Sequence, residues 1–372
     1  MPQSVSSSNG RAIRVVVDGR ELTGNGRFGG LGSFTRSLLA SLAADSTLRV
    51  RALTTDTGTV PAGVEPVRIL RRFDERRRSV YEHEALVSLD VARTGGDVVF
   101  SPVIHGVPWT RKPYVQTLHD VIPLVLPNAD LAYLRKWWRR WARAYRRADA
   151  VVAVSRHSAD EGIRVLGLAP DRVHVAYNGV SAKFTPRPSG EPDEPPYLLV
   201  VSDYQPRKGL RDTVAVAGAL ADLGYPHTLK IAGRVQPQFE NEVDEIVATA
   251  PRPDRVERLG FVDDLVELYR GASLFVWCSR YEGFGLPVAE AMACGVPVVS
   301  YANSSLPEIV GDGGILVPDG DVEAMVGAAR SLLDDRARWE ELREAGIERA
   351  GEFTWDKSAS VYEEIFRGLA AR

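Results

Sequence analysis

The strongest constraint on the fold is an alternation of strands and helices that runs twice along the chain, once on each side of a proline-rich segment. Residues 185–196 contain five prolines and no aliphatic side chain. Proline lacks an amide hydrogen and fixes φ, so such a segment cannot form a central strand or a helix interior. We therefore interpret 186–196 as a linker between two domains.

Short apolar segments on both sides of this linker are typical of strands buried on both faces of a parallel sheet. Helical spacing of apolar residues lies between several of them, as in Phe34, Leu38, Leu39 and Leu42, where Ser33 is the expected N-cap. The expected strands are 13–18, 97–102, 114–120, 150–155, 172–177, 197–202, 228–233, 256–262, 272–279, 296–301 and 314–318, and the expected helices include 286–294, 321–333 and 355–369.

Two such halves predict an α/β protein made of two doubly wound domains. The expected N-terminal domain covers 11–185 and the C-terminal domain 197–354. The amphipathic segment at about 355–370 is expected to pack back on the N-terminal domain. Ligands of doubly wound sheets bind outside the carboxyl ends of the strands, so the cleft between the domains is the expected site.

Composition and charge exclude several classes of protein. The formal charge of −3, from 46 Lys and Arg against 49 Asp and Glu, provides no overall field for binding nucleic acid. Cys278 and Cys294 are too few for a disulfide scaffold and favour a reducing compartment. No segment approaches the ~20 apolar residues of a membrane span, and Met1–Gly10 lack the features of a secretory signal. We expect a cytoplasmic protein.

The sharpest candidate site lies at 280–299, where Glu282 and Glu290 are eight residues apart between an apolar strand and an apolar helix. Gly283 and Gly285 let a ligand approach the backbone closely, and Pro287 suits the first turn of a helix. Two solvated acids around an ordinary turn would not explain the glycines between them. Amides at such a helix start attract anions and hydroxyls, here those of Phe284, Gly285 and Leu286.

Two more polar segments follow expected strands. His119 and Asp120 end the strand at 114–120, at the edge of the sheet where ligands bind. Arg207 and Lys208 follow the first strand of the second half. Adjacent cations on a loop are usually solvated surface, but these lie where a diphosphate would need countercharge.

Segment 22–33 is rich in glycine, and a glycine loop that opens into a helix can cradle phosphate. Its stretch from Gly24 to Gly29 matches the GxGxxG of dinucleotide-binding proteins. The match starts six residues after the strand that ends at Asp18, and the helix is expected only after Gly32. An NAD-dependent oxidoreductase is therefore the less favoured alternative.

Segment 134–147 has seven basic residues and no acid, with aromatic residues at helical spacing. It is either a helix on anionic lipid or at a lipid-linked acceptor, or a helix with a buried aromatic stripe and a solvated basic face. Asp319 and Asp321 form a DxD pattern, which we interpret as a turn and a helix cap rather than a metal site.

These motifs together resemble a known family. EGFGLPVAE, 282–290, resembles the E-x7-E signature of retaining nucleotide-sugar glycosyltransferases with the GT-B fold, the glycosyl transferases of group 1 and family 4, in their mannosyltransferase-like branch. Further segments that are similar in the same order are Gly30–Thr35, His119–Pro123, Ala150–Ser155 with Ser158, Gln205–Gly209 and Asn303–Glu308. One departure is Ser33-Phe34, where the branch often has Arg-Tyr.

The resemblance implies two Rossmann-like domains facing across a cleft and a retaining hexosyltransferase that needs no metal or other cofactor. The implied donor is GDP-mannose first and a UDP-hexose second, and the acceptor is a glycan, a lipid-linked molecule or a small molecule. A GT-B-like epimerase or phosphorylase would use the same cleft. A sugar-binding module without activity would leave the paired glutamates and the cations without a task.

The resemblance also implies a role for each site residue. Glu290 would accept hydrogen bonds from the ribose, and Glu282 with the amides of 284–286 would hold the donor sugar. His119 would contact the same sugar near its anomeric carbon. The remaining implied contacts are Arg207, Lys208, Gly30 and Gly32 with the diphosphate, and the backbone of Phe261 and Val262 with the base.

Overall fold

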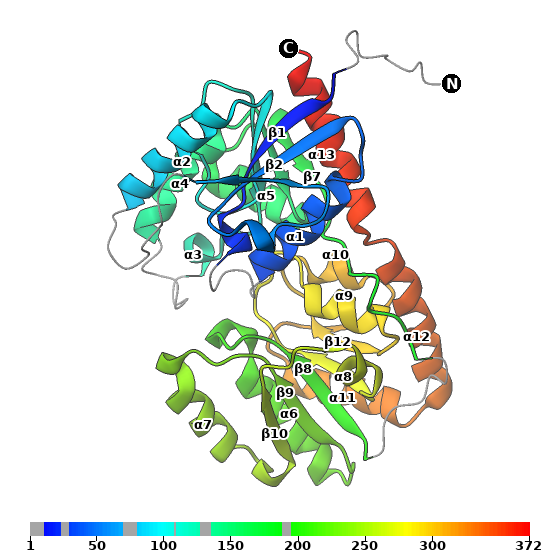
Figure 1. The fold of residues 1–372 in the computed structure, drawn as a ribbon. Helices are drawn as coiled ribbons and strands as arrows, with labels where there is room; N and C mark the ends of the chain where they lie inside the picture. The colour runs from blue at the N-terminus through cyan, green and yellow to red at the C-terminus, as the bar shows by residue number, and fades with distance from the viewer. Residues whose placement is uncertain (1–10, 24–29, 70–79, 108, 127–134, 188–194) are drawn as a thin grey trace.

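The computed structural model describes residues 11–23, 30–69, 80–107, 109–126, 135–187 and 195–372, which form two α/β halves (Figure 1). The first half contains a seven-stranded sheet in the order β3-β2-β1-β4-β5-β6-β7, and the second a six-stranded sheet in the order β10-β9-β8-β11-β12-β13. All strand pairs are parallel. The strands are β1 (Ile13–Asp18), β2 (Leu48–Thr54), β3 (Glu65–Arg68), β4 (Val98–Ser101), β5 (Tyr114–Leu118), β6 (Ala150–Ala153), β7 (Val173–Val175), β8 (Tyr197–Val201), β9 (Thr228–Ala232), β10 (Val256–Gly260), β11 (Leu274–Trp277), β12 (Val298–Tyr301) and β13 (Gly314–Val317).

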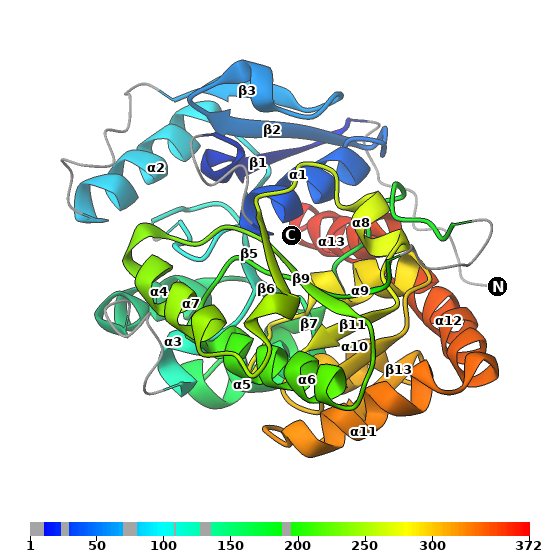
Figure 2. The ribbon, with the colours of Figure 1, turned by 90° about the horizontal axis from the view of Figure 1, so that it is seen from below.

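Helices cover both sheets, as the alternating sequence pattern requires (Figures 1 and 2). In each sheet the strand order reverses beside the first strand of that half, between β1 and β4 and between β8 and β11. Ligands bind at such reversals, at the carboxyl ends of the strands. The helices are α1 (Gly30–Leu42), α2 (Val80–Thr94), α3 (Ile122–Val125), α4 (Arg135–Arg147), α5 (Arg156–Leu166), α6 (Leu210–Asp222), α7 (Glu240–Ala248), α8 (Val266–Arg270), α9 (Leu286–Ala293), α10 (Leu306–Val310), α11 (Val322–Leu333), α12 (Arg336–Gly351) and α13 (Trp355–Ala370).

The predicted α/β class with two doubly wound halves is confirmed. Every expected strand is present, most of them shorter by one or two residues at an end. Two strands were not predicted, β2 and β3. The sequence of β2 places arginines between apolar residues, and β3 contains Pro66, which is tolerated because β3 is an edge strand.

The start of α1 differs from the prediction, because the helix begins at Gly30 and Ser33 lies in its first turn rather than at its N-cap. Gly32 is buried on the same face as Thr35, Leu38 and Leu39. That packed face reaches one turn further back than the apolar residues alone suggest. Gly24, Gly26 and Gly29 lie outside the described residues, as does most of the expected linker 186–196.

The basic and aromatic helix α4 buries its aromatic stripe inside the first half. Trp138, Trp141 and Tyr145 are all buried, and Trp138 stacks on Tyr145 with ring centroids 5.8 Å apart. The stripe is therefore part of the core, as the alternative with a buried aromatic stripe predicted, and contact of the basic face with lipid stays a prediction. Leu134 lies outside the described residues. None of the helices in the described ranges is long and apolar enough to cross a bilayer.

The C-terminal helix α13 lies against the first half although α12 lies against the second (Figure 1). Phe366 and Tyr362 pack on Phe100 of β4, with ring centroids 5.6 and 5.1 Å apart. The hydroxyl groups of Tyr362 and Thr117 are 2.9 Å apart in the buried interface. Figure 2, seen from below, shows α13 beside α1. The chain thus crosses between the halves twice, and the C-terminus completes the core of the first half.

Phe366→Ala tests this packing. Phe366 is fully buried, so we expect a loss of about 3–5 kcal/mol in the free energy of unfolding, from lost apolar burial and the cavity that remains. Urea unfolding followed by circular dichroism measures it. Leu223→Ala is the control, because Leu223 is 53% exposed and its change should stay within about 0.5 kcal/mol. Equal losses for both variants would contradict the anchoring role of α13.

Candidate active site

A cleft of about 550 Å³ lies between the carboxyl ends of the two sheets. The first half contributes the start of α1 and the end of β5, and the second half contributes the loops after β8 and β11 and the start of α9. Of the predicted site residues, those that line the cleft are Gly30, His119, Arg207, Lys208, Phe261, Val262, Glu282, Gly283, Phe284, Gly285, Leu286 and Glu290. Gly32 is buried in the packed face of α1 and is not among the residues that line the cleft, and its contact with the diphosphate stays a prediction.

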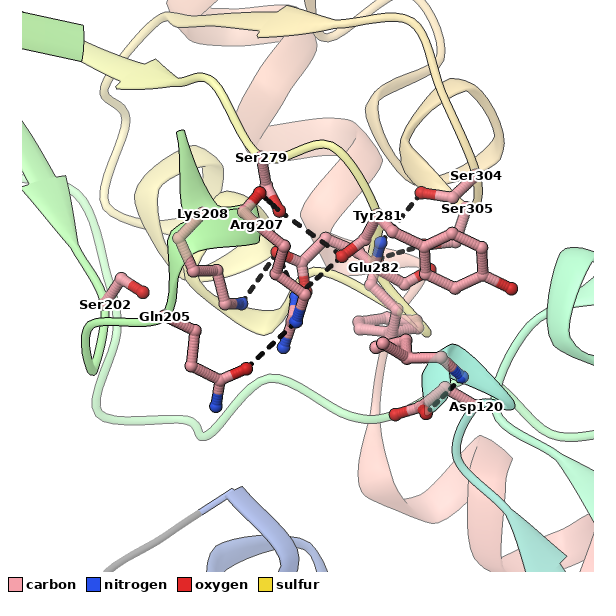
Figure 3. A network of polar contacts seen from close by, with 12 residues as sticks. Asp120, Ser202, Gln205, Arg207, Lys208, Ser279, Tyr281, Glu282, Ser304 and Ser305 are labelled. Carbon is pink, nitrogen blue, oxygen red and sulfur yellow. Dashed lines mark hydrogen bonds and ion pairs between the residues drawn. The ribbon is translucent and has the colours of Figure 1, made fainter. Parts of the chain in front are cut away.

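Glu282 forms the centre of the charged network in Figure 3. Its Oε1 lies 2.7 Å from Lys208 Nζ and 3.6 Å from Arg207 Nη1, and all three side chains are nearly buried. Burial alone would raise the pKa of the Glu282 carboxyl, but Lys208 and Arg207 outweigh it and hold the pKa below its usual value. Burial lowers the pKa of Lys208 to about 8, against the opposing effect of Glu282. Two cations and one anion leave this cluster with one positive charge.

Arg207 is fixed by neighbours other than the carboxylate. Its Nη1 donates to the carbonyl oxygen of Tyr281 at 2.7 Å, and its Nε donates to the Gln205 amide oxygen at 3.0 Å (Figure 3). Arg207 and Lys208 belong to a single 3-10 turn, Pro206–Lys208, which is followed by Gly209 with a φ of 69°. A Cβ at Gly209 would lie 1.9 Å from the carbonyl oxygen of Cys278. The cations are thus pre-placed by a turn that requires glycine.

The loop that carries Glu282 is held by the segment that follows β12. The Glu282 amide donates to Ser304 Oγ at 2.8 Å, and Ser305 Oγ bonds the carbonyl oxygens of Glu282 and Phe284 at 3.1 and 2.9 Å (Figure 3). Ser304 has a φ of 48°, the one positive φ outside glycine in the described residues. Such a conformation is costly for a side-chain-bearing residue and is often found at functional sites.

Glu290 lies one turn into α9, after the left-handed Gly285 and the first-turn Pro287 that were predicted to start this helix. Burial raises the pKa of Glu290 to about 7. Tyr269 Oη donates to Glu290 Oε2 at 3.1 Å. Sequence analysis missed Tyr269, because a tyrosine on a separate short helix carries no pattern that points to Glu290.

His119 faces the cleft from the end of β5. Its Nε2 lies 2.7 Å from the carbonyl oxygen of Pro102, and because a carbonyl only accepts, Nε2 carries the proton and Nδ1 is left as an acceptor. Burial lowers the pKa of His119, so the ring is neutral near pH 7. Phe34 packs edge-on against it, with ring centroids 4.7 Å apart. The neighbouring Asp120 accepts from the Ile122 amide at 2.9 Å, which starts α3.

The DxD pattern has local structural roles. Asp321 caps α11 by accepting from the Ala324 amide at 2.9 Å, as predicted. Asp319 lies 3.5 Å from Arg280 and accepts from Asn303. Across the described ranges, no group of three or more His, Cys, Asp or Glu side chains is arranged to hold a metal ion.

Comparisons with known proteins assign this architecture to a family. Residues 28–184 match the model of Glycosyltransferase Family 4, and residues 181–352 match that of Glycosyl transferases group 1. O-antigen chain mannosyltransferase B of Escherichia coli is 32% identical over 279 residues, which cover 68% of this chain and 71% of that protein. Serotype-specific mannosyltransferase WbdA of Escherichia coli is 30% identical over 281 residues, but these cover only 34% of that longer protein.

Solved structures of other glycosyltransferases have the same fold. Sucrose-phosphate synthase from Thermosynechococcus elongatus superimposes with a TM-score of 0.80 at 22% identity, covering 97% of this chain and all of that one. Anabaena HepE in complex with UDP-glucose superimposes with a TM-score of 0.74 at 18% identity and covers 96% of this chain and all of that one.

The protein is a glycosyltransferase of the GT-B fold. It belongs to the glycosyl transferases of group 1 and family 4, as the motifs predicted. The prediction of a hexosyltransferase is also confirmed, because the similar proteins include mannosyltransferases. The roles of individual cleft residues stay predictions.

Gly283→Ala tests the closeness of the two halves at the cleft. A Cβ at Gly283 would lie 2.1 Å from the carbonyl oxygen of His119 on the opposite half. The halves must separate to admit it, so we expect turnover to fall by at least about 100-fold and stability by about 1–3 kcal/mol. Gly327→Ala in α11 is the control, because its Cβ would meet nothing within 4 Å and should stabilise by about 0.5–1 kcal/mol. Full activity of Gly283→Ala would contradict this geometry.

Proposed function

We propose that this enzyme is a retaining, metal-independent hexosyltransferase that uses a nucleotide-sugar, with GDP-mannose as the first candidate donor and a UDP-hexose as the second. The observation that carries the proposal is the buried pair Arg207 and Lys208 around Glu282, facing His119 across the cleft. The mannosyltransferases among its relatives favour mannose, and the binding of UDP-glucose by HepE keeps the second candidate open.

In the proposed reaction the bond between the anomeric carbon and the diphosphate oxygen breaks, and an acceptor hydroxyl forms the new bond on the same face. The acceptor proton passes to the departing diphosphate. In this proposal the developing charge on that leaving group is stabilised by Arg207 and Lys208, which are fixed before the reaction, and by the glycine segment at Gly30. These cations supply the countercharge that other enzymes obtain from a metal ion.

The remaining cleft residues fit the other parts of the donor. Glu282 and the amides of 284–286 would hold sugar hydroxyls, and Glu290 would accept from the ribose. The half-exposed Phe261, with Val262 beside it, would meet the base. His119 would donate no proton to the sugar, because its Nε2–H is bonded to Pro102, and its Nδ1 lone pair would stabilise positive charge near the anomeric carbon.

An epimerase or phosphorylase on the same fold would use the same cations, and an oxidoreductase would need a nicotinamide cofactor. A turnover screen of nucleotide-sugars, scored by release of nucleotide diphosphate with and without EDTA, tests the proposal without a known acceptor. We expect slow hydrolysis of one hexose donor, unaffected by EDTA. Loss of turnover in EDTA that Mg²⁺ restores would overturn metal independence, and product that stays attached to nucleotide would favour an epimerase.

The acceptor side of the proposal includes contact with anionic lipid. Arg139, Arg143, Arg146 and Arg147 lie exposed on α4, and such a basic face is attracted to acidic headgroups without any insertion of the buried aromatic stripe. Sedimentation with vesicles containing phosphatidylglycerol tests it, and binding equal to that of neutral vesicles would remove the contact.

Binding of the nucleotide diphosphate should have a narrow pH optimum. The proposed roles need Glu290 as a carboxylate and Lys208 as an ammonium, and their pKa values are about 7 and about 8. Affinity should therefore rise as the pH rises through the first value and fall above the second. Calorimetric titration from about pH 6 to pH 9 measures it.

Glu290→Gln is the matched variant for this titration. It should weaken binding by about 1.5–3 kcal/mol where the wild-type residue is charged, and it should remove the acidic limb that Glu290 causes. Titration of the nucleotide's own phosphate remains in both proteins and is cancelled by the comparison. Wild-type affinity in this variant at every pH would exclude Glu290 from the nucleotide site.

The stereochemical outcome separates a retaining from an inverting reaction. An α-linked nucleotide-sugar should give an α-linked product, which proton NMR of fresh product identifies. His119→Ala should lower turnover by at least about tenfold and leave diphosphate affinity nearly unchanged, because the ring faces the sugar. A β-linked product would instead make His119 Nδ1 the leading candidate for a general base.

A further inference from the structure

Glu308 belongs to α10 of the second half, but its carboxylate binds the first half. Oε2 accepts from the Arg156 amide at 3.0 Å and from Tyr177 Oη at 2.9 Å, and Oε1 accepts from the His157 amide at 2.9 Å. Arg156 and His157 are the first two residues of α5. Amides in a first turn have no partner within their helix, and a negative charge is favoured there. A carboxylate from the other half thus completes this helix start.

The same first turn of α5 also contacts both candidate catalytic segments. Ser155 Oγ donates to the carbonyl oxygen of Gly283 at 2.6 Å. Ser158 Oγ lies 2.9 Å from the carbonyl oxygen of His119 and 3.1 Å from that of Gly283. One turn of helix is therefore bonded to the end of β5, which carries His119, and to the loop that carries Glu282.

Glu308 is itself braced where the chain crosses between the halves. Arg349 donates to the carbonyl oxygens of Glu308 and Ile309 and lies over the ring of Phe353. Phe353 packs against Tyr177 and accepts through its carbonyl from Val180 at 2.9 Å. Movement of α10 away from α5 would therefore disturb the cleft and also the segment around Phe353, where the chain passes from the second half to the first.

From these contacts we propose that Glu308 is a positioning residue for the transfer reaction. By binding the start of α5, it keeps His119 of the first half at a fixed position relative to Glu282 of the second half. Glu308 is not among the residues that line the cleft. The kinetic consequence rests on the proposed function, whereas the tie between α10 and α5 does not.

The division of the site between the halves determines what should change. Arg207, Lys208 and Glu290 all belong to the second half, so the diphosphate keeps most of its contacts when the tie is lost. His119 belongs to the first half, so its placement against the sugar is lost. The expected signature is a fall in kcat with little change in diphosphate affinity.

Glu308→Gln is the main variant, because it keeps the shape and one acceptor oxygen but removes the charge, and Glu308→Ala removes both acceptors. Asp335→Asn is the matched control: Asp335 accepts from the Arg338 amide at 3.1 Å and caps α12 within the second half. The measurements are donor turnover, nucleotide-diphosphate affinity by calorimetry, and hydrogen–deuterium exchange of a peptide covering 155–160.

For Glu308→Gln we expect kcat to fall by about tenfold, and further in Glu308→Ala, with diphosphate affinity within about threefold of wild type. Exchange at 156 and 157 should speed up by about tenfold. Asp335→Asn should keep wild-type kcat and wild-type exchange at these amides.

Wild-type kcat and wild-type exchange in both Glu308 variants would overturn the proposal. It would also be overturned if Asp335→Asn lost as much kcat and as much diphosphate affinity as the Glu308 variants. If the wild-type enzyme turns over no nucleotide-sugar, the proposed function fails. The exchange experiment then still decides whether Glu308 ties α10 to α5.

Discussion

The site depends on one buried carboxylate held between two cations. A lone charge at the depth of Glu282 would be expelled or neutralised, and so would the ammonium of Lys208 without its partner. Their 2.7 Å contact, with Arg207 at 3.6 Å, allows all three to remain at the cleft with one positive charge in excess. The glycine turn at Gly209 and the serines after β12 hold the backbones that bring these side chains together.

The second constraint is the closeness of the halves at Gly283. No side chain fits between this residue and the carbonyl of His119. Its own carbonyl is bonded by Ser155 and Ser158 of the opposite half. The catalytic candidates therefore lie at the ends of two different sheets, which meet here through backbone atoms and hydroxyl groups. Contacts of this kind are directional, and they fix orientation more strictly than apolar packing would.

Much of this could be predicted from the sequence, because strand ends and helix starts are local features. The loop at 282–290, the strand end at His119 and the cations at 207 and 208 each follow an apolar strand, and parallel strands bring such ends to one edge. Contacts made only by the tertiary fold could not be predicted. The bond from Tyr269 to Glu290 spans 21 residues and that from Arg156 to Glu308 spans 152.

The charge balance also suggests how donor recognition is coupled within the proposed reaction. A nucleotide diphosphate carries more negative charge than Glu282, and it would compete with that carboxylate for Lys208 and Arg207. Each cation contact that the diphosphate gains leaves a Glu282 oxygen with fewer partners, and a buried carboxylate must regain them. In the proposed binding mode the sugar hydroxyls of the same donor would supply them. In that binding mode, binding of the leaving group and binding of the sugar would reinforce each other, and an intact nucleotide-sugar would bind more tightly than its free parts.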